Sequence, residues 1–159
     1  MNPTKNLLLA MAMAPLVALA AGNSGNHRED HDQTTIGHVG EPGNPSRVIR
    51  TVKVAMHDSM RFTPDRISVK AGDTVRFVVR NTGKVEHEMV IGTNSELREH
   101  AQMMRDMPMA GHVDSNQISL APGLQGSLIW KFDRPGTADF ACLLPGHYEA
   151  GMVGRVTVK

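Results

Sequence analysis

Short runs of alternating apolar and polar residues recur along residues 47–159. In residues 74–80, the apolar positions Val75, Phe77 and Val79 fall two residues apart, which is the period of a β-strand that buries one face. Turn signals that contain Gly or Pro separate these runs. Many short strands at this spacing predict an all-β fold, a β-sandwich of two packed sheets.

The predicted strands lie at residues 48–56, 67–69, 74–80, 85–91, 117–120, 126–132, 137–142 and 153–158. Residues 95–107 break this alternation. Leu97, Ala101 and Met104 follow the spacing of a helical face there, and Ser95 is a candidate N-cap. We therefore expect a short helical insertion between two strands.

Two segments precede the predicted domain. Residues 1–20 carry one basic side chain, then an apolar run too short to span a bilayer, and end in Ala18-Leu19-Ala20. This pattern predicts a signal peptide cleaved after Ala20 and a mature protein exported to the periplasm. Residues 21–46 contain Gly, Asn, His and charged residues with almost nothing to bury, so we predict a flexible tail there and a domain over residues 47–159.

The charge balance and the cysteine content of the chain limit the functions that are possible for it. Lys and Arg number 17 against 16 Asp and Glu, and they form no basic patch of the kind that binds nucleic acid. Cys142 is the single cysteine of the chain, so it has no internal disulfide partner, and a free thiol is a liability in an oxidising compartment. Metal ligation would remove this liability, because a coordinated thiolate is not free for exchange.

Cys142 opens a run in which potential metal ligands recur with four residues between each pair. Cys142, His147 and Met152 occupy these positions. One thiolate, two imidazoles and a weak axial thioether form the ligand set of a blue-copper electron-transfer site. His87, on a separate predicted strand, is the best candidate for the second imidazole. Each residue alone is more often a packing or surface residue, but their combined pattern predicts a copper site.

These motifs resemble those of the cupredoxins, the small type 1 copper proteins, over residues 47–159. The Cys-x4-His-x4-Met spacing is similar to that of rusticyanin. The sequences His-Glu-Met-Val-Ile-Gly and Pro-Gly-His-Tyr-Glu-Ala-Gly-Met, with the histidine-bearing tail, most resemble the periplasmic copper-tolerance cupredoxins of bacteria. The resemblance implies a Greek-key β-sandwich and one type 1 copper held by His87, Cys142, His147 and Met152. It also implies that an apolar surface around His147 docks with a redox partner.

Glu88 departs from the family pattern. Many cupredoxins have Asn directly after the upstream histidine, and this Asn ties the two ligand loops together. A carboxylate is also able to accept hydrogen bonds from a loop, but it changes the charge near copper. Because outer groups tune a bound metal, a typical potential or colour does not carry over to this chain.

Further histidines and methionines are candidates for weaker copper sites. The candidates are His27, His31 and His38 in the tail, and Met103, Met107 and Met109 in and after the helical insertion. Imidazoles bind Cu(II) well and thioethers select Cu(I). The alternatives are a solvated linker for the histidines and flexible packing for the methionines.

The sequence is compatible with two functions. The first is a periplasmic copper-tolerance protein that binds copper, cycles between Cu(I) and Cu(II) and passes the ion to a transient partner. The second is a diffusible one-electron carrier between respiratory partners. We expect a monomer and no enzyme, because Ala141 and Leu143 stand where oxidases of this lineage place histidines beside the cysteine. A binuclear CuA centre would also need a second cysteine.

Overall fold

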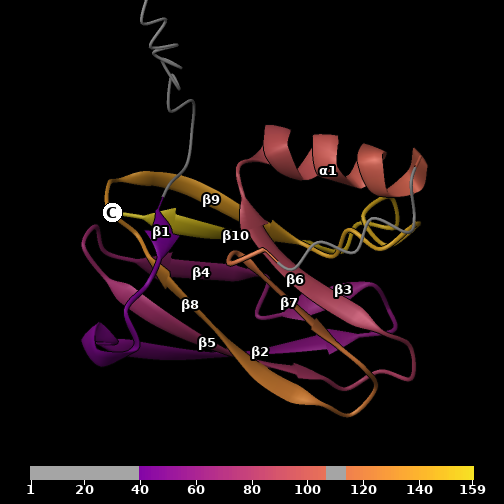
Figure 1. The fold of residues 1–159 in the computed structure, drawn as a ribbon, viewed down its shortest axis with the longest axis horizontal. Helices are drawn as coiled ribbons and strands as arrows, with labels where there is room; N and C mark the ends of the chain where they lie inside the picture. The colour runs from indigo at the N-terminus through magenta and orange to yellow at the C-terminus, as the bar shows by residue number, and fades with distance from the viewer. Residues whose placement is uncertain (1–39, 107–113) are drawn as a thin grey trace, which may run out of the picture. The chain divides into compact units, whose positions relative to one another are not determined.

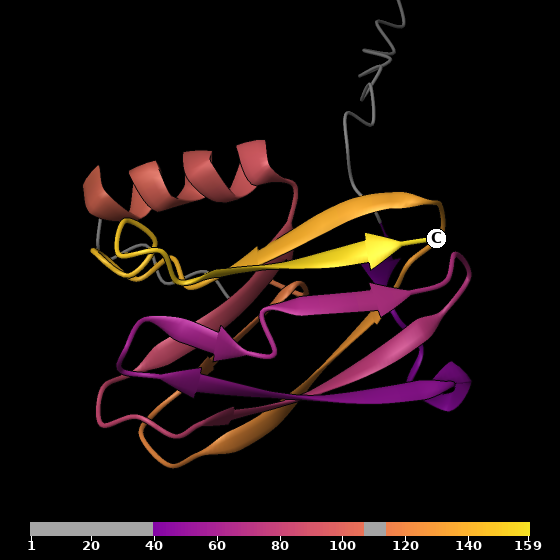
Figure 2. The same cartoon turned by 180° about the vertical axis from the view of Figure 1, so that it is seen from behind.

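Two five-stranded sheets pack face to face, and one helix lies on the outer side of the second sheet (Figures 1 and 2). The computed structural model describes residues 40–106 and 114–159. Within these ranges, no helix is long and apolar enough to cross a membrane. The predicted signal peptide, the tail as far as residue 39 with His27, His31 and His38, and Met107 and Met109 lie outside the described residues.

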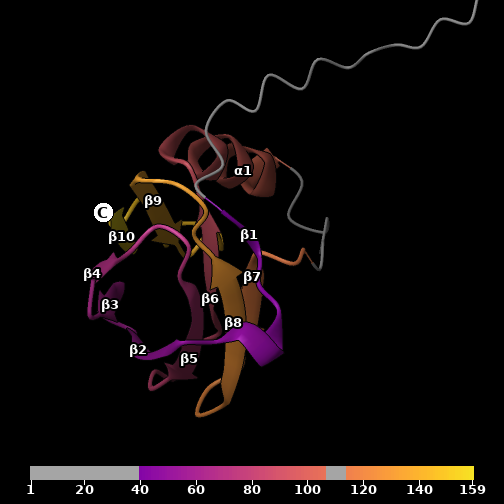
Figure 3. The same cartoon turned by 90° about the vertical axis from the view of Figure 1, so that its left-hand side faces the viewer.

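The first sheet has the order β1 (Glu41–Pro42), β8 (Gln125–Lys131), β5 (Thr74–Asn81), β2 (Arg50–His57) and β3 (Arg61–Thr63). The second has the order β4 (Arg66–Val69), β10 (Val153–Val158), β9 (Gly136–Ala141), β6 (His87–Gly92) and β7 (Gln117–Leu120). The pairs β2–β5 and β4–β10 are parallel and the others are antiparallel. The two sheets are seen nearly edge-on in Figure 3. The predicted β-sandwich with a short helix is confirmed, although the sequence analysis missed β1 and β3.

Alternation along the strands separates two apolar clusters. The main core lies between the sheets and contains Met89 and Ile91 of β6 with Phe140 of β9. The intervening residues, Val90 and Ala141, point the other way and pack beneath the helix. Because both faces of β6 are covered, its residues from His87 to Ile91 are all buried. The burial of this strand therefore does not alternate from one residue to the next.

Helix α1 (Asn94–Asp106) is the predicted insertion. Its buried residues, Leu97 and Ala101, press on the outer face of β6 and β9. The N-cap is Thr93, not the predicted Ser95. The Thr93 hydroxyl accepts a hydrogen bond from Glu96 N at 3.3 Å, and the Glu96 carboxylate accepts one from Thr93 N at 2.8 Å. This reciprocal capping box fixes where the strand ends and the helix begins.

Residues 40–46, which the sequence analysis assigned to the tail, contact the first sheet. Strand β1 pairs with β8, Gly43 N donates a hydrogen bond to Ile129 O at 2.9 Å, and a 3-10 turn follows at Pro45–Arg47. Gly40 packs so closely that a Cβ there would overlap the Trp130 indole. The last residues of the predicted tail therefore belong to the first sheet. Their Gly and Pro content hides this, because the contacts are made mainly by backbone.

A comparison of two N-terminal truncations tests this corrected boundary. A protein that begins at Arg47 should be less stable than one that begins at Gly40 by about 1–3 kcal/mol, because it loses β1 hydrogen bonds and the cover over Trp130. Urea unfolding of the metal-free proteins measures the difference. Glu41→Gln in the longer protein is the control, since the exposed Lys131–Glu41 ion pair contributes at most about 1 kcal/mol. Equal free energies of unfolding for the two truncations would leave β1 without a stabilising role.

Candidate metal centre

The candidate ligands meet at one end of the sandwich because of how two neighbouring strands are paired. His87 is the first residue of β6, and Cys142 directly follows β9. The two strands run antiparallel with Val90 opposite Ala141, so the start of β6 lies beside the end of β9. Residues 142–152, here called the ligand loop, then connect β9 to β10. In Figures 1 and 2 this loop lies at the end of the sheet opposite to the C-terminus.

Three donor atoms converge there. One side-chain donor atom each from His87, Cys142 and His147 lies within 4.8 Å of the other two. The Sγ atom of Cys142 is 3.2 Å from Nδ1 of His147, and the two imidazole centroids are 5.0 Å apart at an interplanar angle of 53°. No second group of three His, Cys, Asp or Glu side chains with this proximity occurs in the part of the chain that the structure describes.

Met152 closes the ligand loop through its backbone. Its N–H donates to His147 O at 3.0 Å, and its carbonyl accepts a hydrogen bond from Cys142 N at 3.1 Å. The Met152 side chain is fully buried, in the same core cluster as Cys142. The loop therefore brings Met152 next to Cys142, where β9 ends and β10 begins.

The imidazole of His87 has one satisfied nitrogen and one unsatisfied nitrogen. Its Nε2 lies 3.1 Å from Oδ1 of Asp58, whereas its Nδ1 is buried without a hydrogen-bond partner among the described residues. A buried polar atom without a partner is costly and calls for an explanation such as a metal ion. With a proton on Nε2, the Nδ1 lone pair is free to bind a metal, so this donor set fits a copper ion.

Burial sets the protonation of the other two donors. It raises the pKa of the Cys142 thiol to about 12, so the metal-free thiol is protonated at neutral pH. Burial, helped by the nearby His87, lowers the pKa of His147, which keeps that imidazole neutral. Glu88 N–H points at the Cys142 sulfur at 3.4 Å. Because metal ligands must be deprotonated, metal binding here displaces the thiol proton.

The comparisons with known proteins identify a copper-binding family. A family model described as copper binding proteins, plastocyanin/azurin family, matches residues 49–159. The chain belongs to this family. The predicted resemblance to cupredoxins is thereby confirmed.

Relatives of similar length carry a more specific name. A copper-resistant cuproprotein CopI from Rubrivivax gelatinosus is 42% identical and aligns over 98% of this chain and 99% of its own. A CopI from Vibrio cholerae is 34% identical over 96% and 98% of the two chains. In fold, the chain is similar to a reduced auracyanin from Roseiflexus castenholzii, with a TM-score of 0.60, 24% identity and coverage of 69% of this chain and 96% of that one.

Glu88 takes the place that many cupredoxins give to Asn, and its carboxylate accepts a hydrogen bond from the ligand loop. Its Oε1 accepts a hydrogen bond from Leu143 N at 2.9 Å and its Oε2 accepts one from the Ser119 hydroxyl at 3.2 Å. Glu88 is buried, and this burial raises its pKa. The carboxylate thus links the residue after one histidine to the residue after the cysteine.

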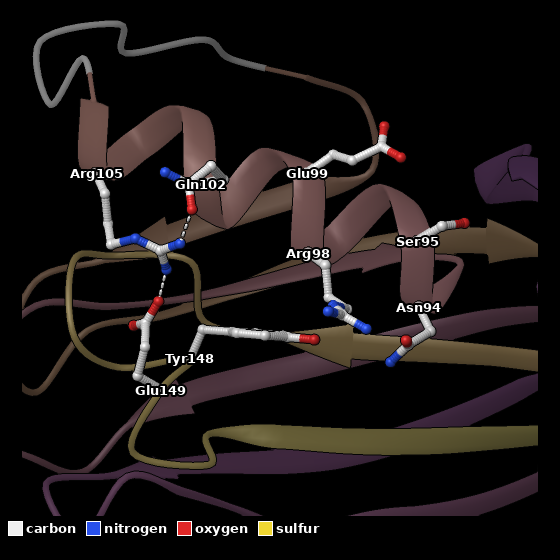
Figure 4. Close-up of a pocket in the computed structure, with 8 residues that line it drawn as sticks. All are labelled: Asn94, Ser95, Arg98, Glu99, Gln102, Arg105, Tyr148 and Glu149. Carbon is white, nitrogen blue, oxygen red and sulfur yellow. Dashed lines mark hydrogen bonds and ion pairs between the residues drawn. The ribbon is translucent and has the colours of Figure 1, made fainter.

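Two cationic side chains hold the outer part of the ligand loop, and the sequence analysis identified neither. Arg61 of β3 donates to the carbonyl oxygens of Ala150 and Gly151 at 2.9 and 3.3 Å. Arg105 of α1 forms an ion pair with Glu149 (Figure 4). Partners so far apart in sequence leave no local signal, which is why these contacts appear only in the structure.

A groove separates α1 from the ligand loop. Figure 4 shows its lining, which comprises Asn94, Ser95, Arg98, Glu99, Gln102, Arg105, Tyr148 and Glu149. Tyr148 also packs on the apolar cluster beneath the helix. Around the half-buried His147, Pro145 and Ala150 are exposed. Met103 lies on α1, partly exposed.

Replacement of Glu88 tests its role as the link between ligand segments. Glu88→Ala should lower the free energy of unfolding by about 1–3 kcal/mol, because Leu143 N–H stays buried without an acceptor. Glu88→Gln should cost less, since the amide is able to accept from Leu143 and donate to Ser119. Urea unfolding of the metal-free proteins measures both. The control is Glu86→Ala at an exposed neighbouring position, expected within about 0.5 kcal/mol of wild type. If the two alanine variants were equally stable, the link would contribute nothing.

Proposed function

We propose that this protein is an exported type 1 copper protein that binds one copper through His87, Cys142, His147 and Met152 and acts in copper tolerance. The observation that carries the proposal is the convergence of the Cys142 sulfur and the His147 Nδ1 with an imidazole whose buried Nδ1 has no partner among the described residues. Bound there, copper supplies a one-electron Cu(I)/Cu(II) couple.

The protein's own contribution is a fixed, dry donor set. Cys142 would supply the thiolate, His87 and His147 neutral imidazoles, and Met152 a weakly bound thioether. Backbone hydrogen bonds within the ligand loop and the Glu88 link hold these side chains. Since both oxidation states accept this arrangement tolerably, an electron is able to enter or leave with little rearrangement.

Copper tolerance is the role that the relatives favour. The CopI proteins of Rubrivivax gelatinosus and Vibrio cholerae are named copper-resistant cuproproteins, and the alignment runs almost the full length of each chain. The predicted signal peptide supports export to the periplasm. We further propose weaker copper binding by His27, His31 and His38 and by Met103, Met107 and Met109, which would add capacity when the ion is abundant.

A diffusible electron carrier is the second candidate. The observation that favours it is the position of His147, half-buried at the surface between the exposed Pro145 and Ala150. Such a site suits brief docking of a monomer with a protein that delivers or takes an electron or a copper ion. We infer no catalysis, since Ala141 and Leu143 flank the cysteine where an oxidase would need histidines.

Two substitutions in the ligand loop test the proposed ligands. Cys142→Ser should abolish the intense visible thiolate-to-Cu(II) band, because a hydroxyl is a hard and poorly ionised replacement for a thiolate. Met152→Leu should keep the band and raise the reduction potential, since it removes a weak donor that favours Cu(II). Absorption spectra and redox titrations measure these effects. His57→Gln, a histidine outside the donor set, is the control.

Two results of these measurements would contradict the proposed ligands. A persistent band in the Cys142→Ser protein would remove Cys142 from the site, and an unchanged potential in Met152→Leu would remove Met152. Copper that still binds to the Cys142→Ser protein in a titration would measure the additional weaker sites.

Growth of a deletion strain on graded copper separates the two candidate functions. For copper tolerance, we expect sensitivity to high copper with normal respiration, rescued by the wild-type gene and not by Cys142→Ser. Oxygen consumption measured in parallel provides the comparison. Impaired respiration at low copper, with unchanged survival at high copper, would instead favour the electron carrier.

A further inference from the structure

We propose that Asp58 is a positioning residue for the upstream copper ligand. Its carboxylate fixes the His87 imidazole with Nδ1 turned to the metal, and its charge favours the Cu(II) state. The inference rests on the copper site proposed above and adds to it a residue outside all four ligands. Asp58 belongs to the turn between β2 and β3, 29 residues before His87.

The Asp58 carboxylate binds both the segment that leads into β6 and the side chain of His87. Oδ2 of Asp58 accepts a hydrogen bond from Lys84 N at 2.8 Å, and Oδ1 accepts one from Val85 N at 3.4 Å. Oδ1 also lies 3.1 Å from Nε2 of His87. The side chain therefore binds both the backbone that leads into β6 and the imidazole that β6 presents, so it sets the position and the rotation of the ring together.

The neighbouring loop makes room for this contact. A Cβ built at Gly83 would overlap the Asp58 carboxylate, so the close approach requires glycine at that position. Asn81 holds the same loop from inside, because its Nδ2 donates to Val85 O at 2.7 Å and to Leu120 O at 2.9 Å. Asp58 thus binds a loop that Asn81 also holds in place. A contact with a fixed loop keeps the carboxylate in one position relative to His87.

The contact also selects the tautomer of His87. A carboxylate acceptor at Nε2 requires the proton of the neutral imidazole to be on Nε2, which leaves the Nδ1 lone pair free for the metal. The buried Nδ1 has no other partner among the described residues. Because the Asp58 side chain is 39% exposed while that of His87 is fully buried, the hydrogen bond joins a buried ligand to a charge at the surface.

The tautomer is the first test. Nitrogen-15 NMR of the metal-free protein at mildly alkaline pH should find the His87 proton on Nε2. Asp58→Asn should keep this tautomer, since the amide oxygen still accepts, whereas Asp58→Ala should give a mixture. A wild-type proton on Nδ1 would overturn the inference without any copper being present.

The reduction potential is the second test. Asp58→Asn keeps an acceptor but removes the charge, so it should lower the Cu(II) affinity about tenfold relative to the Cu(I) affinity, a rise of about 59 mV for a one-electron couple. The matched control is Asp73→Asn. Asp73 also accepts a backbone hydrogen bond in a turn, from Lys70 N at 2.9 Å, but it precedes β5 at the end away from the ligands.

The outcomes separate the inference from the copper site itself. A wild-type thiolate band together with equal potentials in Asp58→Asn and Asp73→Asn would overturn the role of Asp58 and leave the copper site standing. A wild-type protein without that band would remove the proposed copper site and, with it, the redox role of Asp58.

Discussion

The antiparallel pairing of β6 with β9 is the constraint on which the site depends. This pairing brings the start of β6 beside the end of β9, and the side chains of His87 and Cys142, 55 positions apart in sequence, converge there. The hydrogen bonds of the sheet, reinforced by a buried core on one face and α1 on the other, make that meeting point rigid. The rest of the ligand loop, after Cys142, then holds the other two candidate donors, His147 and Met152, in a short segment that leads into β10.

Charged side chains from other elements also hold the ligand loop in place. Glu88 reaches the start of the ligand loop from β6, Arg61 reaches its outer carbonyls from β3, and Arg105 reaches it from α1. Each comes from a different element, so the path of the loop is determined by the whole domain and not by the loop's own sequence. The helical insertion has a structural role in this arrangement, because it covers part of the outer face of β6 and β9 and supplies one of the contacts.

Sequence reasoning identified the features whose signals are local. The spacing of Cys142, His147 and Met152 lies within eleven residues, and the alternation of Thr74–Asn81 is strong enough to reveal a strand. What it missed depends on contacts between distant segments. Strand β1 joins the sheet through backbone bonds of residues that resemble a linker, and Asp58 looks like an ordinary turn residue until His87 is seen beside it. The helix cap was different: Thr93 and Glu96 form a capping box whose residue types are visible in the sequence, so the prediction of Ser95 as the N-cap missed a local signal.

The three charged contacts on the ligand loop have a consequence for how the protein is supplied with metal. Since they are all made between protein groups, the loop has its shape before any ion arrives, and loading is a binding step that requires no refolding. In the copper-tolerance role proposed above, the empty protein would therefore serve as a ready acceptor. The uptake of copper by such a protein would be limited by how fast ions diffuse to the site and not by how fast new protein is made.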